Sequence, residues 1–157
     1  MAEVKQGRWT ARVDGDFVVF LIGARLELRH PVRSFNDLGG MRGMQHMLKY
    51  LTEHPEKGLL GFHTHGLTTV QYWRSFADLE RFASNADDPH LAPWRKYWKR
   101  VGKSARTGIW HETFLVREGE YESIYGNMPS FGLGNATELV PLSADATARG
   151  RLKRLTH

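Results

Sequence analysis

The stretch from Thr68 to Val101 (TTVQYWRSFADLERFASNADDPHLAPWRKYWKRV) constrains the fold of this chain more than any other part of it. It opens with the alternation of a strand, which places Tyr72 and Trp73 on opposite faces. Ser75 follows as a favourable N-cap, and apolar residues then recur at helical spacing. The pattern therefore predicts a strand that passes directly into a helix.

A second helix is expected in the same stretch. The run from Asp87 to Pro89 breaks the first helix, and the next one should begin near Pro93, with Trp94 and Trp98 in its apolar stripe. His90 falls between the two helices. Two indoles and a titratable imidazole are thus gathered around one turn, which is more than a simple connection needs.

The remaining elements come from the same kind of pattern. The pattern predicts a polar lead-in at residues 1–16, a linking stretch that follows His30-Pro31 and runs to Gly40, and a Gly/Pro-punctuated loop at 128–134. The expected regular elements are strands at 17–27, 59–65, 68–74, 109–116 and 121–126, and a helix at 41–54. Gly66-Leu67 should close a hairpin between two of these strands.

This order of elements is the split βαβ pattern of a ferredoxin-like α+β domain, with an antiparallel sheet and helices on one face. The other face of the sheet also needs a cover, and we find no segment of the chain left to supply it. Pairing two sheets across a two-fold axis would bury both uncovered faces, so the pattern predicts a homodimer.

Composition limits the classes of function. The 157 residues fit one domain, and 41% apolar with 25% charged residues is ordinary for a globular protein. Cysteine is absent, which excludes disulfides and thiolate chemistry. We see no signal peptide and no apolar run long enough to span a bilayer, so we expect a cytoplasmic protein without a membrane partner.

The formal net charge of +5 raises the question of nucleic-acid binding. Six basic residues lie between Arg95 and Arg106 and alternate with aromatic ones, which is one form of stacking platform. A solvated basic face on a helix whose indoles face the core explains the same pattern more simply. We therefore predict no nucleic-acid partner, although an acidic substrate or partner remains open.

Four segments together resemble a known family: QYWRSFADLERFA, DDPHLAPWRKY, IWHETF and YGNMPSFGLG. They are similar to the monooxygenase-like branch of the dimeric α+β barrel superfamily, and nearest to the family named after a fumagillin-pathway monooxygenase. The superfamily also contains haem-degrading monooxygenases and haem-containing aldoxime dehydratases. The resemblance covers residues 8–140 and implies a dimeric barrel domain with a pocket between sheet and helices. Residues 141–157 are then a basic, loosely ordered tail or an arm that embraces the partner subunit.

The resemblance also implies site residues. Trp73 matches a tryptophan that reaches the cavity, and His90 matches a histidine just after the following helix. The positive end of the helix near Pro93 disfavours an imidazolium, so a neutral His90 could act as a general base or as an iron ligand. The alternative is a structural His90 that caps the turn by bonding Asp87 or Asp88.

Two further candidates come from the strands. His111 could project into the barrel as a catalytic residue or pack as a satisfied core histidine. Arg25, late in an apolar strand, must find an anion there, either a substrate group or a carboxylate such as Glu27 or Glu112. Five residues complete the expected substrate pocket: Tyr72, Met44, Met47, Trp94 and Phe131. His63 and His65 share a strand face, but we find no third ligand and predict no metal site.

Three functions follow from these residues and the resemblance. The first is a cofactor-independent monooxygenase that oxidises a hydrophobic small molecule with O2, with a pocket histidine as base. The second is a haem enzyme in which His90 or His111 binds iron and the activity is haem degradation, peroxidation or aldoxime dehydration. The third is a dimer that binds an apolar ligand without catalysis. We favour the first, mainly through the resemblance.

Overall fold

The computed structural model describes residues 2–40, 43–143 and 147–154. Its main sheet contains four antiparallel strands in the order β3-β4-β2-β5. Their bounds are β2 (Phe17–Arg25), β3 (Leu59–His65), β4 (Thr68–Trp73) and β5 (Gly108–Val116). The hairpin between β3 and β4 turns at residues 66–67, as expected.

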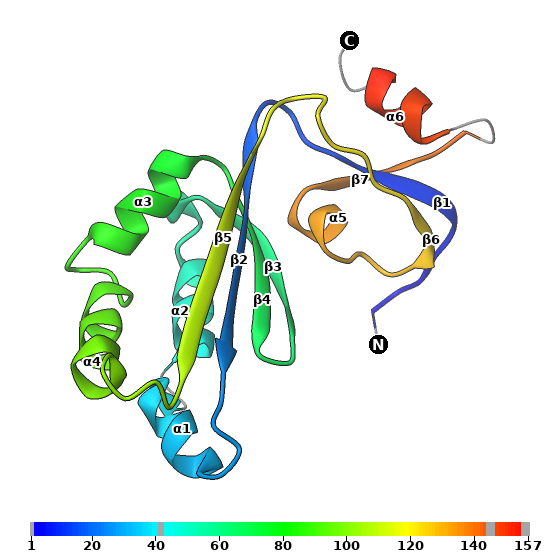
Figure 1. Ribbon diagram of the computed structural model, residues 1–157. Helices are drawn as coiled ribbons and strands as arrows, with labels where there is room; N and C mark the ends of the chain where they lie inside the picture. The colour runs from blue at the N-terminus through cyan, green and yellow to red at the C-terminus, as the bar shows by residue number, and fades with distance from the viewer. Residues whose placement is uncertain (1, 41–42, 144–146, 155–157) are drawn as a thin grey trace.

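Helices cover one face of this sheet, on the left of Figure 1. They are α1 (Pro31–Asp37), α2 (Met44–Glu53), α3 (Phe76–Ser84) and α4 (Leu91–Val101), with a short 3-10 turn at Pro55–Lys57. Between them and the sheet lies a core that includes Val18, Leu51, Trp73 and Phe82. The chain order of strands, helices and sheet positions confirms the expected ferredoxin-like α+β fold.

A second sheet lies against the opposite face of the main sheet. It has three strands in the order β6-β1-β7: β1 (Lys5–Arg12), β6 (Tyr125–Met128) and β7 (Glu138–Pro141), with the short helix α5 (Leu133–Ala136) beside them. Ala11 and Leu133 from this layer pack with Phe17 of β2. Figure 1 shows the second sheet on the side away from α2, α3 and α4.

Several expectations about the chain's ends and connections are therefore wrong. The supposed polar lead-in contains β1, and the supposed linking stretch contains most of α1. The strand expected at 121–126 is instead β6, which pairs with β1 and not with the main sheet. The claim that nothing in the chain could cover the second face also fails, because the second sheet covers part of it. β1 could not be predicted from the sequence, because Ala11 and Thr10 are its only buried residues and the strand therefore lacks an alternating apolar pattern.

Helix boundaries differ from the expected ones in smaller ways. The helix α4 begins at Leu91, before Pro93, and it buries Tyr97 and Val101 while leaving Trp98 half exposed. Residues 41–42, with which the preceding helix was expected to start, lie outside the described residues, and α2 begins at Met44. Within residues 2–40, 43–143 and 147–154 no helix has the length and apolar character needed to cross a bilayer.

The segment after residue 140 is described in part. It contains the last residue of β7, Pro141, and the helix α6 (Ala148–Arg154), in which Arg151 is buried and its guanidinium lies 2.6 Å from the Glu122 carboxylate. Residues 144–146 and 155–157 of the expected tail lie outside the described residues. The domain boundary at 140 and the role of this segment as a dimer arm stay predictions.

Candidate functional site

A cavity of about 370 Å³ lies between the main sheet and the helices α1, α2 and α4. Its walls are largely apolar, with Ile22 and Ala24 of β2 facing Met44, Met47 and Leu48 of α2. Its position at one end of the sheet follows from the fold, because β2, the β3–β4 hairpin and α1 all reach this end (Figure 1). A volume of this size suits a small organic molecule.

His90 lines this cavity at the first turn of α4. Its Nδ1 lies 3.0 Å from the carbonyl oxygen of Ala83, at the end of α3. Because a carbonyl oxygen only accepts hydrogen bonds, Nδ1 carries the proton and donates it. In the neutral imidazole, Nε2 is then the nitrogen with a free lone pair. This contact replaces the bond to Asp87 or Asp88 that a capping role would have required.

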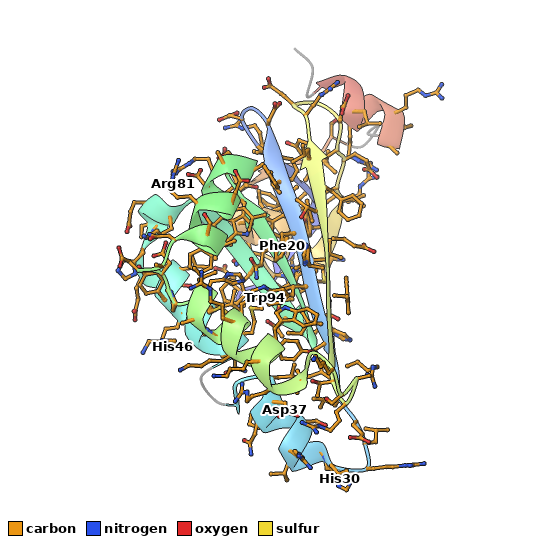
Figure 2. All side chains as sticks on the ribbon, turned by 60° about the vertical axis from the view of Figure 1, so that its left-hand side comes forward. Phe20, His30, Asp37, His46, Arg81 and Trp94 are labelled. Carbon is orange, nitrogen blue, oxygen red and sulfur yellow. The ribbon has the colours of Figure 1, made fainter. Side chains whose placement is uncertain are left out.

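Aromatic rings fix the orientation of the His90 ring. Trp94, one helical turn later, stacks on it with an interplanar angle of 18° and a centroid distance of 6.2 Å. Phe82 lies on another side at 5.8 Å. Figure 2 shows Trp94 between α4 and the sheet. With one nitrogen bonded to Ala83 and rings on two sides, the imidazole has little freedom to rotate.

Asp88 links the turn that carries His90 to α2 through a hydrogen bond from Tyr50. The Asp88 carboxylate is buried, accepts a hydrogen bond of 2.9 Å from Tyr50 Oη and 3.1 Å from Asn85 Nδ2, and lies 2.7 Å from Lys57 Nζ. Burial raises the pKa of Asp88, but the bonds from Lys57 and Tyr50 outweigh it and leave that pKa below the ordinary aspartate value. The carboxylate is therefore ionised and holds three elements together.

Few polar groups share the cavity with His90. Thr64 and Thr69 face each other across β3 and β4, with their hydroxyl oxygens 3.4 Å apart. Tyr97 Oη donates to the Thr107 carbonyl at 3.2 Å, so its proton is already used. Gln45 adds an amide near the first turn of α2. Sequence reasoning missed Thr64, Thr69 and Tyr97, since each looks like ordinary strand or helix packing.

The structure brings together four of the residues expected in the site. His90, Met44, Met47 and Trp94 all line the cavity. Trp73, in contrast, is fully buried in the core and lies behind the wall. Its indole Nε1 donates to Gln71 Oε1 at 2.9 Å, and the amide Nε2 of Gln71 lies 3.7 Å from the Met44 sulfur. Trp73 thus contacts the cavity wall from behind, through Gln71 and Met44 and through the core against which Met47 packs.

Arg25 and His111 lie apart from this cavity. Arg25 is exposed at the end of β2, where its Nη2 donates to the Ala105 carbonyl at 2.7 Å. The partner of Arg25 in this structure is therefore a backbone carbonyl and not Glu27 or Glu112. His111 is exposed on the edge strand β5, with its ring 5.4 Å from that of Phe20.

Tyr72 and Phe131 lie on the other face of the main sheet, beside the second sheet. His63 joins them, with its ring 4.6 Å from Phe131 and 6.4 Å from Tyr72. Burial, with a smaller contribution from His65, lowers the pKa of His63. Burial, reinforced by Tyr125, raises the pKa of Tyr72. The part of the chain that the structure describes contains no cluster of three or more acidic or histidine residues suited to a metal ion.

Comparison with known proteins places this chain in a family. The sequence model of the Monooxygenase af470-like family matches residues 17–133. The chain belongs to this family. A curated relative, Monooxygenase af470 of Aspergillus fumigatus, is 28% identical over an alignment 172 positions long, which covers 94% of this chain and 60% of the relative. The chain therefore spans about three fifths of that relative's length.

A solved structure is also similar, at a greater distance. The crystal structure of aldoxime dehydratase matches 86% of this chain and 44% of its own, with 18% sequence identity and a TM-score of 0.46. The family match itself spans the whole main sheet, its helices and His90. Two strands of the second sheet, β1 and β7, fall outside it. The family match thus includes β6 of the second sheet, while the similarity to the curated relative covers 94% of the chain.

Proposed function

We propose that this member of the Monooxygenase af470-like family oxidises a hydrophobic small molecule with O2, without a cofactor, and that His90 is the base. The observation that supports this most is the state of His90. It lines an apolar cavity, and Ala83 binds its Nδ1, so that Nε2 is left as a proton acceptor. A general base must offer a lone pair to the substrate, and Nε2 is the nitrogen of His90 that this arrangement leaves for that role.

The proposed reaction starts with an activated C–H or O–H group of the substrate. His90 Nε2 takes the proton, and the resulting carbanion or enolate gives its electrons to O2. The protonated histidine then returns a proton to the peroxide, which forms a hydroperoxide. At a CH2 carbon, loss of water leaves a carbonyl, so one oxygen atom enters the product, the other leaves as water, and the substrate is the sole reductant.

The cavity walls support an uncharged substrate. None of the described residues that line it is a lysine, arginine, aspartate or glutamate. The enolate oxygen would accept from neutral donors, and the hydroxyl groups of Thr64 and Thr69 are the candidates on the sheet side. Arg25, expected for this role from the sequence, is not among the lining residues.

Haem is the competing interpretation, and His90 is the residue that would ligate its iron. None of the described lining residues is a lysine or arginine, so the cations for the two propionates of haem would have to come from the basic segments that flank the cavity. We place no step of the reaction on haem. A non-catalytic protein that binds an apolar ligand would use the same cavity without needing His90.

A hemin titration followed by absorption separates these functions. We expect no saturable Soret shift with the wild-type protein, and O2 consumption with activated phenols or ketones that His90→Gln abolishes. His111→Gln is the matched control, because His111 was an equal candidate from the sequence but lies outside the cavity. A Soret shift that saturates at one haem per subunit and disappears in His90→Gln would refute the cofactor-free reaction. Ligand binding with no O2 uptake would leave a binding protein.

We also propose that the functional unit is a homodimer. Trp110 and Phe114 are large apolar residues of β5 that stay about half exposed on the face that the second sheet covers only in part. Sedimentation equilibrium tests this, and Phe114→Asp should lower the dimer affinity. A wild-type protein that stays monomeric at tens of micromolar would contradict the proposal.

A further inference from the structure

Exposed apolar side chains lie at the end of the molecule that holds the cavity, two of them in its lining and two in the adjoining segment at the start of α1. Phe35 of α1 and Leu67 of the β3–β4 hairpin both line the cavity, yet they remain 45% and 50% exposed. Leu28 and Val32, just before and at the start of α1, are 87% and 73% exposed. Val32 and Phe35 are three residues apart and so share one face of the helix. These four exposed apolar residues are called the apolar rim below.

The same end of the molecule carries the chain's excess positive charge. The two segments that flank the cavity, 26–38 and 91–107, contain eight Lys or Arg and two Asp or Glu, a net charge of +6, whereas the whole chain carries +5. One of the two acids, Asp37, is buried, and Arg106 lies 3.5 Å from its carboxylate. Figures 1 and 2 show α1 at the tip of this end, next to α4.

Exposed apolar residues surrounded by basic residues are the combination that binds an anionic membrane surface. We propose that this end of the protein docks on an anionic lipid membrane, with Leu28 and Val32 inserted among the lipid chains and the cavity mouth facing the bilayer. Basic residues near such a surface are attracted to anionic headgroups, and apolar side chains gain by entering the headgroup–acyl boundary. No spanning helix is needed, so the proposal is compatible with the absence of one among the described residues.

Docking in this orientation would serve the cavity directly. A hydrophobic ligand partitions into the bilayer, and its transfer into an apolar cavity through water exposes apolar surface. With Phe35 and Leu67 at both the rim and the cavity wall, the ligand would pass from lipid to protein along apolar side chains. The inference rests on exposure and charge, and it holds whether the cavity is catalytic or only binds its ligand.

Two other partners fit these observations less well. A second copy of the chain in a two-fold dimer would place this patch against itself, so that +6 would face +6. Nucleic acid would be attracted by the charge, but the exposed aliphatic Leu28 and Val32 offer it neither stacking nor hydrogen bonds. Both remain distinguishable outcomes of the experiment.

The experiment is co-sedimentation of the full chain with phosphatidylcholine vesicles, with and without phosphatidylserine. We expect binding to the anionic vesicles that is much weaker on neutral ones. Arg29→Gln/Arg33→Gln should reduce the partition coefficient roughly 25-fold, at about fivefold per basic residue near the surface. Leu28→Ser/Val32→Ser should reduce it at least about tenfold, because both side chains lose their insertion. All four residues are exposed, so the variants should keep the wild-type melting temperature.

Matched controls lie away from this end. Leu115 on β5 is exposed and apolar, and Lys49 on α2 is an exposed cation, so Leu115→Ser and Lys49→Gln should bind vesicles as the wild type does. Failure to bind anionic vesicles, or equal losses in the control and rim variants, would overturn the proposal. Self-association abolished by Leu28→Ser/Val32→Ser, without vesicle binding, would assign the rim to a second copy instead. The assay contains no substrate, so its failure says nothing about O2 chemistry.

Discussion

Replacing Phe82 by alanine should disturb both the core and the candidate base. Phe82 is buried in the helix-side core, and its ring lies 5.7 Å from Trp73, 6.5 Å from Tyr50 and 5.8 Å from His90. The substitution therefore removes one wall of the His90 ring as well as a large packed side chain. Leu51→Ala is the control, because Leu51 belongs to the same core but makes no ring contact with His90.

The expected loss of stability follows from packing. A buried Phe→Ala change costs about 3–5 kcal/mol and a Leu→Ala change about 2–5 kcal/mol, with the larger values where the surroundings do not collapse into the cavity. Phe82 has rigid aromatic neighbours on three sides, so we expect about 4 kcal/mol for Phe82→Ala. A domain of this kind has about 5–15 kcal/mol in total, so Phe82→Leu serves as the milder variant if the alanine variant does not fold.

Urea denaturation measures the free energies, and NMR of the imidazole protons reports on His90. In Phe82→Ala or Phe82→Leu, we expect the His90 resonances to move toward those of the exposed His30 and to change linewidth, because the ring gains freedom. Leu51→Ala should lower stability without moving them. A loss below about 1 kcal/mol for Phe82→Ala, or identical His90 resonances in all variants, would refute the account of how the ring is held.

Three further predictions concern the fold. Ser75→Ala should cost about 1 kcal/mol, since Ser75 Oγ accepts from the Asp78 N–H at 3.1 Å, whereas Ser84→Ala at an exposed site should cost little. Burial lowers the pKa of His63, because it penalises the protonated imidazole in the folded state. The neutral His63 leaves the folded state at full stability above the unfolded pKa of about 6.5, and stability falls as pH drops below that value. His63→Gln should therefore lose less stability between pH 7 and pH 5 in denaturant titrations than the wild type. Gly58→Ala, at φ 98° and with its Cβ 2.7 Å from the Asp78 side chain, should lower the melting temperature more than Gly66→Ala, which is strained but meets open space.

Much of the main sheet could be predicted from the sequence because its strands are regular and half buried. The strand at 59–65 and the N-cap Ser75 are confirmed to the residue, and the strand at 17–27 ends two residues early. In each case the local pattern and the tertiary packing favour the same structure. The helix α4 is the partial exception, since Tyr97 takes the buried place that the pattern gave to Trp98.

The second sheet could not be predicted because its evidence is not local. β1 has a sequence of mostly polar, exposed residues, and its strand character comes from pairing with β6 and β7, over a hundred residues away. β6 and β7 are four residues each, too short for a periodic signal. Long-range pairing of short strands leaves almost no trace in a single sequence.

The residues of the candidate site could also be predicted only in part. Trp94 and the two methionines could be assigned to one cavity because they lie on helices whose faces the pattern indicates. His90 precedes the first residue of α4, and its assignment came from the family resemblance. Arg25 could not be excluded, because the pattern does not show that this last residue of β2 meets the Ala105 carbonyl. His111 could not be excluded either, because a strand's alternation gives the face but not whether that strand lies at the edge of the sheet. β5 is an edge strand, and both faces of its central part are open.

The edge position of β5 and the position of the second sheet together limit the surface on which two copies of the chain could pair. A ferredoxin-like sheet with one bare face would pair over its full area, but here the second sheet packs over Phe17 and Tyr72 on that face. What remains bare lies along β5, where Trp110 covers Gly23 so closely that a Cβ there would lie 2.5 Å from the indole. Trp110 is thus fixed in place by its own subunit while it stays partly exposed. A dimer built on this surface would therefore be offset toward β5 and would leave the basic, lipid-facing end of each subunit free.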